Sequence, residues 1–183
     1  MLIFILILLL KILAFKSSIK KFKGFKKGRN MLEYLFLITT VTNLLHLIYI
    51  LCKITGIEDN KFGSSVFSIL VPNIITMSLY YWIILSPHIK LSDNINYSCL
   101  YLHLFSALFV ISDYINNPRE LSYTPNIYWF IFLYSIVILN KIIVGNWSYK
   151  NLTNIYKTHS HMLFNIYAAV VLFLVRILNN TYV

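Results

Sequence analysis

Long apolar stretches recur along this chain of 183 residues, separated by short polar segments. A transmembrane helix needs roughly 20 apolar residues, so stretches of this kind constrain the fold more than any other feature of the sequence. In lipid, only helices and closed barrels satisfy their own backbone hydrogen bonds. The stretches lie near residues 1–15, 34–53, 66–86, 97–115, 127–144 and 161–178. They predict an all-α polytopic membrane protein, a bundle of about six transmembrane helices.

The composition agrees with this class. Hydrophobic residues make up 58% of the chain and charged residues only 12%, whereas soluble domains carry about a quarter. The mean hydropathy is +0.71. Spans joined by short loops use up the whole sequence, so we expect a single transmembrane domain over residues 1–183 and no separate soluble domain.

The first apolar stretch is the shortest. As a helix, residues 1–15 rise only about 22 Å against a hydrocarbon core of roughly 30 Å, so the span must extend into "KSSI" at 16–19 or thin the bilayer. A signal peptide is the alternative. Its positive charges would precede the apolar run, and a small-residue cleavage site would follow it. Neither feature is present, so we expect a retained span whose N-terminus lies outside.

A basic segment follows the first stretch and carries much of the net charge of +10. Such a segment beside a span is the usual cytoplasmic flank, and it can hold anionic lipid at about 1 kcal/mol per basic residue. No folded basic domain accompanies it, so we do not expect nucleic-acid binding. The basic residues of the segment are Lys16, Lys20, Lys21, Lys23, Lys26, Lys27 and Arg29.

Two polar residues have matching depths in different spans. Thr40 lies about six residues into the second span and His103 about six residues into the fourth, which places each about 9 Å below the surface. An even number of crossings separates the two spans, so both enter from the same side. A nucleophile and its base require this shared depth. The alternative for Thr40 is a hydrogen bond to the carbonyl four residues earlier.

The second span also carries a polar stripe. Thr39, Thr42, Asn43 and His46 are spaced by three, four and seven residues, so they share one helix face that we expect to point into the bundle. The stripe either joins helices by hydrogen bonds or forms part of a pocket wall.

Other polar residues have structural interpretations. Asp113 lies about 15 Å along the helix from the fourth-span histidine, so we expect it to end that span at the far interface. Asn73 and Asn140 are expected to hydrogen-bond between helices. Cys52 and Cys99 are expected to be small buried residues. No His, Cys or acidic cluster has metal-ligand spacing and no cofactor motif is present, so we expect neither metal nor cofactor.

Several landmarks together resemble the androgen-induced-gene family of multi-pass membrane threonine hydrolases, which includes the androgen-dependent regulator of tissue factor pathway inhibitor. The resemblance runs from about Tyr34 to Asn180. The resemblance depends on the order and spacing of these landmarks more than on any single motif. The landmarks are "TVTN" at 40–43, Pro72 with Trp82, His103 with Asp113, "GNWSY" at 145–149 and "LVRILNN" at 174–180.

The resemblance implies an enzyme of the carboxylic ester hydrolase type that cleaves fatty acid esters of hydroxy fatty acids. It implies that Thr40 is the nucleophile and His103 the base. Candidates for substrate binding or for stabilising the oxyanion are Asn43, Tyr101 and His46. The chain departs from the family before the histidine, where an Asn-His pair is absent, and at "SPH", residues 86–88, where the family has acidic and basic residues.

The partners implied are a lipid ester substrate and the surrounding membrane lipids, in the endoplasmic reticulum, another endomembrane or the plasma membrane. The sequence predicts no particular oligomer. A second hypothesis is a non-catalytic membrane protein, a small carrier or adaptor, in which the polar stripe only joins helices. A carrier is expected to show repeat halves with Gly or Pro breaks, and only Pro72 resembles such a break.

Overall fold

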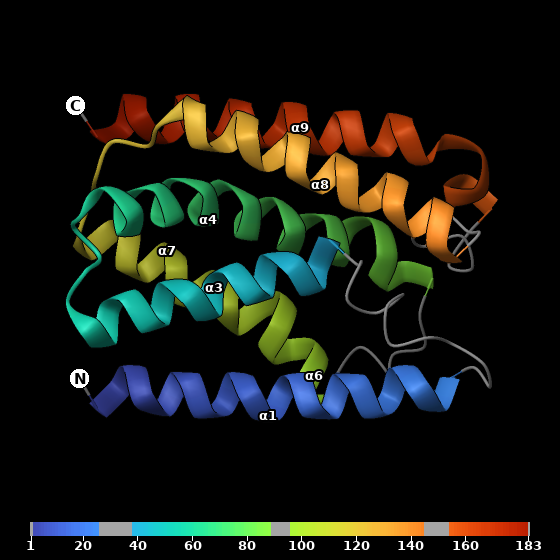
Figure 1. Cartoon of the computed structure of the whole chain (residues 1–183), viewed down its shortest axis with the longest axis horizontal. Helices are drawn as coiled ribbons and strands as arrows, with labels where there is room; N and C mark the ends of the chain where they lie inside the picture. Colours follow the sequence, from blue (N-terminus) through green and yellow to red (C-terminus); the bar gives the residue numbers. More distant parts are fainter. Residues whose placement is uncertain (1, 26–37, 89–95, 145–153, 183) are drawn as a thin grey trace.

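The computed structural model of the chain describes residues 2–25, 38–88, 96–144 and 154–182 (Figure 1). All regular structure within these ranges is helical, which confirms the predicted all-α class. The part of the basic segment beyond Phe25 and the "GNWSY" motif at 145–149 lie outside the described residues.

Six helical segments run through the described ranges. Two of them contain a π-helical turn, in which one extra residue widens the helix; such turns occur frequently at functional sites. The α-helices are α1 (Leu2–Phe25), α3 (Ile38–Thr55), α4 (Lys61–Tyr80), α6 (Tyr97–Leu100), α7 (Ser106–Asn116), α8 (Tyr123–Val144) and α9 (Asn154–Tyr182). The π-turns are η1 (Tyr81–Leu85), which continues α4 and leads into the 3₁₀ turn η2 (Ser86–His88), and η3 (Tyr101–Phe105), which joins α6 to α7.

Five segments are long and apolar enough to cross a membrane, and α8 adds a shorter apolar stretch. Each of the six predicted spans therefore has a helical counterpart, and the chain has the architecture of a multi-pass membrane protein. The first span extends through "KSSIK", to a length of about 28 Å. The long windows are Leu2–Lys20, Ile38–Thr55, Lys61–Ile83, Tyr97–Asn116 and Phe164–Thr181, and the shorter one is Tyr123–Leu139.

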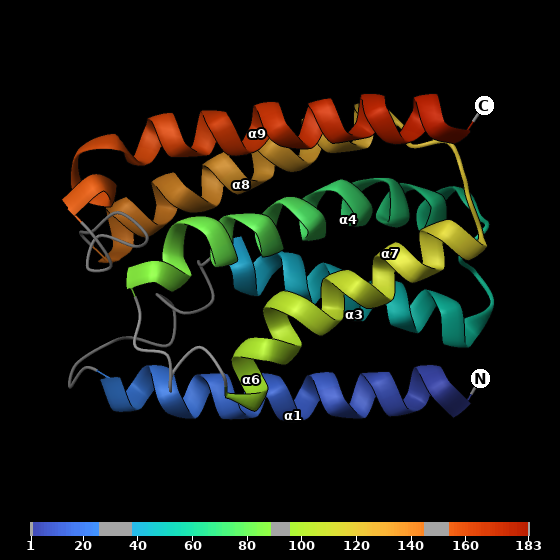
Figure 2. The ribbon, with the colours of Figure 1, turned by 180° about the vertical axis from the view of Figure 1, so that it is seen from behind.

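Helix α4 is the centre of the bundle. It contacts α3 and α7 on one side and α8 and α9 on the other, while α1 packs on the outer flank of α3, α6 and η3 (Figures 1 and 2). Successive long helices run in opposite directions, so the two termini lie at the same end of the bundle. Because α4 is surrounded by protein, 67% of its apolar window is buried, compared with 11% for α1.

A hydrogen bond from another helix compensates for the proline within α4. Pro72 has no N–H to donate to the carbonyl of Ser68, four residues earlier. That carbonyl instead accepts a hydrogen bond of 2.9 Å from the side-chain Nδ2 of Asn126 on α8. In lipid a freed carbonyl needs such a partner, so Pro72 and Asn126 together fix how α8 lies against α4.

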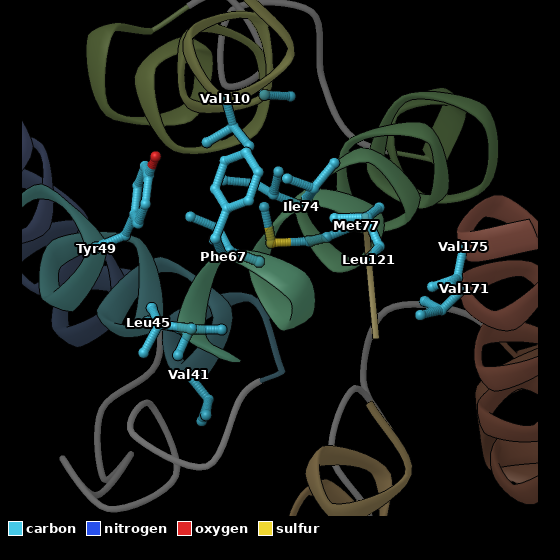
Figure 3. Packing of buried hydrophobic residues seen from close by; sticks show 14 of the residues in the cluster. Val41, Leu45, Tyr49, Phe67, Ile74, Met77, Val110, Leu121, Val171 and Val175 are labelled. Carbon is cyan, nitrogen blue, oxygen red and sulfur yellow. The ribbon is translucent and has the colours of Figure 1, made fainter. Parts of the chain in front are cut away.

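Interlocking side chains fill the space between α3, α4 and α7. Phe67 and Ile74 of α4 pack with Leu45 and Tyr49 of α3 and with Val110 of α7 (Figure 3). Lipid tails are as apolar as these side chains, so close packing rather than removal from water stabilises this contact.

The turn between α3 and α4 is short and well defined. Gly56 ends α3 with a φ of 70°, a left-handed conformation that glycine adopts without strain. Asn60 then caps α4, since its side-chain oxygen accepts a hydrogen bond of 2.8 Å from the N–H of Gly63. A Cβ atom at position 63 would lie 2.3 Å from the carbonyl oxygen of Ile57, so the approach of the turn to α4 requires glycine there.

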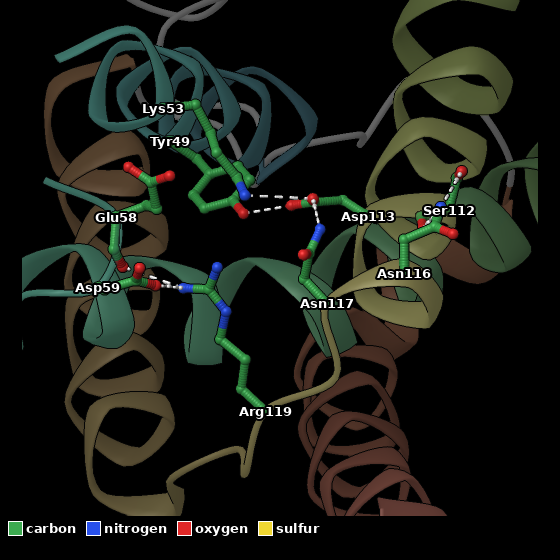
Figure 4. Close-up of polar contacts among 9 residues, drawn as sticks. All are labelled: Tyr49, Lys53, Glu58, Asp59, Ser112, Asp113, Asn116, Asn117 and Arg119. Carbon is green, nitrogen blue, oxygen red and sulfur yellow. Dashed lines mark hydrogen bonds and ion pairs between the residues drawn. The ribbon is translucent and has the colours of Figure 1, made fainter. Parts of the chain in front are cut away.

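Ion pairs between charged residues join the helices at the end of the bundle that contains this turn (Figure 4). Asp113 of α7 forms an ion pair of 3.2 Å with Lys53 of α3 and accepts a hydrogen bond from the Tyr49 hydroxyl. Arg119, which follows α7, pairs with Asp59 of the turn at 2.9 Å. Asp113 thus lies at the end of its span, as predicted, and ties α7 to α3.

Candidate functional site

Thr40 and His103 are both buried in the same half of the bundle. Thr40 is the third residue of α3 and His103 the third of η3, and their exposed fractions are 3% and 8%. Helices α3 and α6 both begin to the right of the middle of the bundle in Figure 1, and both α3 and the segment formed by α6, η3 and α7 run from there toward the left-hand end. Among the described residues, no hydrogen bond joins Thr40 to His103.

The π-turn and its neighbours hold His103. The backbone carbonyl of His103 accepts a hydrogen bond from the Ser78 hydroxyl of α4. Its ring stacks on the ring of Tyr81, with centroids 3.7 Å apart and planes inclined by 12°. Its Nδ1 atom is buried and, in the described part of the chain, has no hydrogen-bond partner. The imidazole is therefore held in place by stacking and retains an unused nitrogen.

A second polar cluster surrounds Lys11, whose exposed fraction is 0%. The Nζ atom of Lys11 lies 2.7 Å from Asn43 Oδ1, 2.6 Å from His46 Nδ1 and 2.7 Å from Ser106 Oγ. These residues come from α1, α3 and α7, so one amine joins three helices that are distant in sequence. We refer to Lys11, Asn43, His46 and Ser106 as the lysine cluster.

The sequence interpretation did not identify Lys11, although a signal for it exists. It is a lone charge in the apolar run "MLIFILILLLKILAF", nine residues from either end of the Leu2–Lys20 window. A lysine at the centre of a membrane helix costs about 2.5–3.5 kcal/mol on insertion scales, and such residues generally face the bundle interior.

Asn43 and Ser106 of the lysine cluster make further hydrogen bonds. The Ser106 hydroxyl donates to the carbonyl of Tyr101 at 2.8 Å. The Asn43 amide nitrogen donates to the carbonyl of Thr39 at 2.9 Å and contacts the sulfur of Met77 at 3.7 Å. The Nε2 atom of His46 is buried and has no partner among the described residues. His46 is therefore the member of the cluster with an unused polar atom.

The polar stripe on α3 faces the bundle interior, as predicted, because Thr42, Asn43 and His46 are fully buried. Of the two interpretations of the stripe, its contacts with Lys11 match the joining of helices.

The three predicted oxyanion donors differ in what they already bind. Asn43 uses its amide as described, and the Tyr101 hydroxyl donates to the carbonyl of Ile7 at 3.0 Å. His46 has a free nitrogen but lies six residues beyond Thr40, about 9 Å along α3. Asn43 or Tyr101 would have to release its present acceptor to serve an oxyanion formed at Thr40.

Asn73 belongs to a separate structural network. Its amide donates to Asn126 Oδ1 at 3.1 Å, and its own Oδ1 accepts from the Tyr167 hydroxyl at 2.9 Å. These bonds join α4 to α8 and α9, which confirms the predicted helix-joining role. The side chain of Asn140 is not among those described.

The cysteines and the metal-binding residue types add no further site. Neither Cys52 nor Cys99 forms a disulfide, and Cys99 donates a hydrogen bond to the Tyr81 hydroxyl. Within the described ranges, no group of three or more His, Cys, Asp or Glu residues is arranged to hold a metal ion.

The fold and these residues define a class of protein: an all-α multi-pass membrane bundle with a lysine cluster at mid-depth and with a buried threonine and a buried histidine, each about one helical turn from that cluster. No protein-family model matches the chain, and no curated protein or solved structure is similar to it at a significant level. The family resemblance therefore remains a prediction that depends on the sequence landmarks alone.

Proposed function

We propose that the chain is an integral-membrane hydrolase that cleaves fatty acid esters of hydroxy fatty acids, with Thr40 as nucleophile and His103 as base. One observation carries the proposal: a buried imidazole with an unpartnered Nδ1 lies in the same half of the bundle as the buried Thr40. Catalytic contacts are often long before substrate binds, so the missing hydrogen bond between the two residues is compatible with this chemistry.

The reaction would proceed in two steps. His103 takes the proton of the Thr40 hydroxyl while Oγ1 bonds to the ester carbonyl carbon, and the hydroxy fatty acid leaves with that proton. Water then attacks the acyl-threonine, loses a proton to His103 and releases the fatty acid and the free Thr40 hydroxyl. The branched Cβ of threonine restricts its rotamers, which helps to keep the hydroxyl directed at the substrate.

The proposal extends to location and lipid partners. An ester with two acyl chains reaches a buried site from the bilayer, and water enters from the nearer interface. We place the protein in the endoplasmic reticulum, another endomembrane or the plasma membrane. The basic segment from Lys16 to Arg29 would face the cytoplasm and contact anionic lipid.

Active-site labelling tests the proposal. Membranes containing the wild type, Thr40→Ala, His103→Ala or Thr42→Ala are treated with a fluorophosphonate probe and assayed with a branched fatty acid ester. We expect Thr40→Ala to abolish labelling and hydrolysis, and His103→Ala to lower both by about 100-fold or more, the loss of a general base. Thr42→Ala, which alters a buried threonine on the same helix, should retain both. Equal labelling of all four proteins would exclude the proposed nucleophile.

A non-catalytic membrane protein, a carrier or adaptor, is the second candidate. The observation that favours it is that the Lys11 amine already joins α1 to Asn43 of α3 and to Ser106 of α7. Such a protein would tolerate Thr40→Ala and His103→Ala in every assay. The labelling experiment therefore separates the two candidates.

A further inference from the structure

His103 and Tyr81 lie face to face within the two π-turns. Tyr81 is the first residue of η1, and His103 is the third residue of η3. Their ring centroids are 3.7 Å apart, and the ring planes are inclined by only 12°. The exposed fractions of the two residues are 7% and 8%, so both rings are largely shielded from the surroundings of the bundle. The imidazole therefore lies directly on the π-face of the tyrosine ring.

Two crossed hydrogen bonds hold this ring pair together. The Ser78 hydroxyl donates to the backbone carbonyl of His103, and the Cys99 thiol donates to the Tyr81 hydroxyl at 2.7 Å. Ser78 precedes Tyr81 by three residues and Cys99 precedes His103 by four, so each helical segment presents a hydrogen-bonding residue and a ring on the same face. The contact between the two rings is therefore fixed from both segments.

The proposed reaction places a positive charge on His103, because the imidazole takes the Thr40 proton. In a Ser-His-Asp triad, a carboxylate beside the histidine stabilises the imidazolium that forms. No carboxylate contacts His103 in the part of the chain that the structure describes. Asp113 lies about 15 Å farther along the helix and pairs with Lys53. Since an unpaired charge within a bilayer is costly, the imidazolium needs another source of stabilisation.

We propose that Tyr81 is a positioning residue that takes the place of this carboxylate, because the negative face of its ring stabilises the imidazolium of His103. A cation within about 6 Å of an aromatic ring centroid is attracted by the ring quadrupole, and the attraction is strongest where water is excluded. The same stack keeps the plane of the imidazole fixed while the proton is transferred. Tyr81 acts through His103, so this inference rests on the proposed hydrolysis and extends it.

Fluorination of the ring at position 81 tests this role with little change in its shape. Tyr81 is replaced by phenylalanine and by phenylalanines that carry one, two or three ring fluorines. Each fluorine withdraws electron density from the ring face and weakens its attraction for a cation, while the packed area hardly changes. Tyr81→Leu removes the aromatic face. Tyr114→Leu is the matched control, because Tyr114 is an equally buried tyrosine that stacks on Phe67 of α4.

The measured quantities are kcat and KM for the fatty acid ester. For each variant, kcat is divided by the fraction of protein that a fluorophosphonate labels at saturation, so that unfolded protein is not counted. We expect Tyr81→Phe to stay within about twofold of the wild type, because it keeps the aromatic face. The kcat per labelled site should then fall steadily along the fluorine series.

Tyr81→Leu should lower kcat per labelled site by about tenfold, the size of one desolvated cation–π contact. KM should stay within about twofold in every variant, because the stabilised charge forms only during the reaction. Tyr114→Leu should keep the wild-type kcat per labelled site even where it lowers the yield of folded protein.

A kcat per labelled site that stays constant along the fluorine series would overturn the inference and leave the hydrolase proposal intact, since those proteins remain active. An equal loss in Tyr114→Leu and Tyr81→Leu would also overturn it, because packing rather than charge would then explain the effect. A wild type that is neither labelled nor active would reject the hydrolase proposal and this inference with it.

Discussion

Lys11 is the residue that most clearly separates this bundle from one held together by apolar packing. Its amine lies within 2.7 Å of three polar side chains on two other helices. Removing any one member of such a hydrogen-bonded group lowers the stability of the fold, because the other members then remain buried without partners. The lysine cluster should therefore contribute to stability.

Removing Asn43 tests this contribution. Asn43→Ala takes an acceptor from Lys11 and a donor from the Thr39 carbonyl, so we expect the free energy of unfolding to fall by about 1–3 kcal/mol. Unfolding in mixed detergent micelles with increasing dodecyl sulfate measures the change. Asn116→Ala, at an exposed position near the end of α7, should stay within about 0.5 kcal/mol of the wild type. An unchanged midpoint for Asn43→Ala would mean that the cluster does not support the fold.

The sequence predicted how deep Thr40 and His103 lie in the membrane, but not which residues they or His46 contact. Counting residues placed Thr40 and His103 in the same half of the bundle because the rise of a helix is fixed. It did not reveal the partner of His46, since Lys11 is distant in sequence and only packing brings α1 beside α3. The stacking of His103 on Tyr81 depends on the two π-turns, which the apolar pattern does not encode.

At the scale of helices, the proline in α4 creates a dependence between two elements. The carbonyl of Ser68 lacks its helical donor because of Pro72 and accepts from Asn126 of α8 instead. The hydrogen bond that α4 lacks because of its proline is thus replaced by one from a neighbouring helix.

A double-mutant cycle measures this dependence. Asn126→Leu alone should lower the free energy of unfolding by about 1–3 kcal/mol, because the Ser68 carbonyl is left without a donor. In a Pro72→Ala background the backbone N–H at position 72 donates to that carbonyl, so the same substitution should cost about 1 kcal/mol less. Equal costs in the two backgrounds, measured by the same micelle unfolding assay, would show that Asn126 acts through other contacts.

The ends of the helices were less predictable than their existence. The third span begins at Lys61 rather than near residue 66, because Asn60 caps a helix whose first two residues, Lys61 and Phe62, are exposed. The first helix continues to Phe25, beyond the apolar run, because lysine is a good helix former. Hydropathy detects the part of a helix that lies in lipid and misses polar extensions of it.

Successive helices of the whole molecule run in opposite directions, and this alternation determines which loops lie on the same side of the membrane. The 56–60 turn and the 117–122 connection are held together by the Arg119–Asp59 ion pair and lie at the end opposite the start of α3 (Figures 1 and 4). The end of α1, with its exposed Lys16 and Lys20, lies at the other end.

Cysteine accessibility tests this arrangement in a membrane. In a Cys52→Ser, Cys99→Ser background, Ile57→Cys and Glu120→Cys should react with an impermeant maleimide from one side, and Lys20→Cys from the other. The charge of the basic segment predicts that Lys20→Cys faces the cytoplasm. Reaction of Ile57→Cys and Glu120→Cys from different sides would contradict the order of the helices.

The packing order of the helices was not predictable from the sequence. Apolar residues face both lipid and protein in a membrane bundle, so periodicity does not show that α4 is central and α1 peripheral. The polar residues carried more information: Asn73, Asn126 and the α3 stripe all point toward neighbouring helices.

The identity of the residue that reacts with a fluorophosphonate tests the central claim most directly. The labelled protein is digested, and the modified peptide is sequenced by mass spectrometry. We expect the phosphonate on Thr40 in the wild type and its loss in His103→Ala, with Thr42 unmodified in both. A phosphonate on any other residue, or hydrolysis of the lipid ester by protein that bears no modification at saturating probe, would contradict the account.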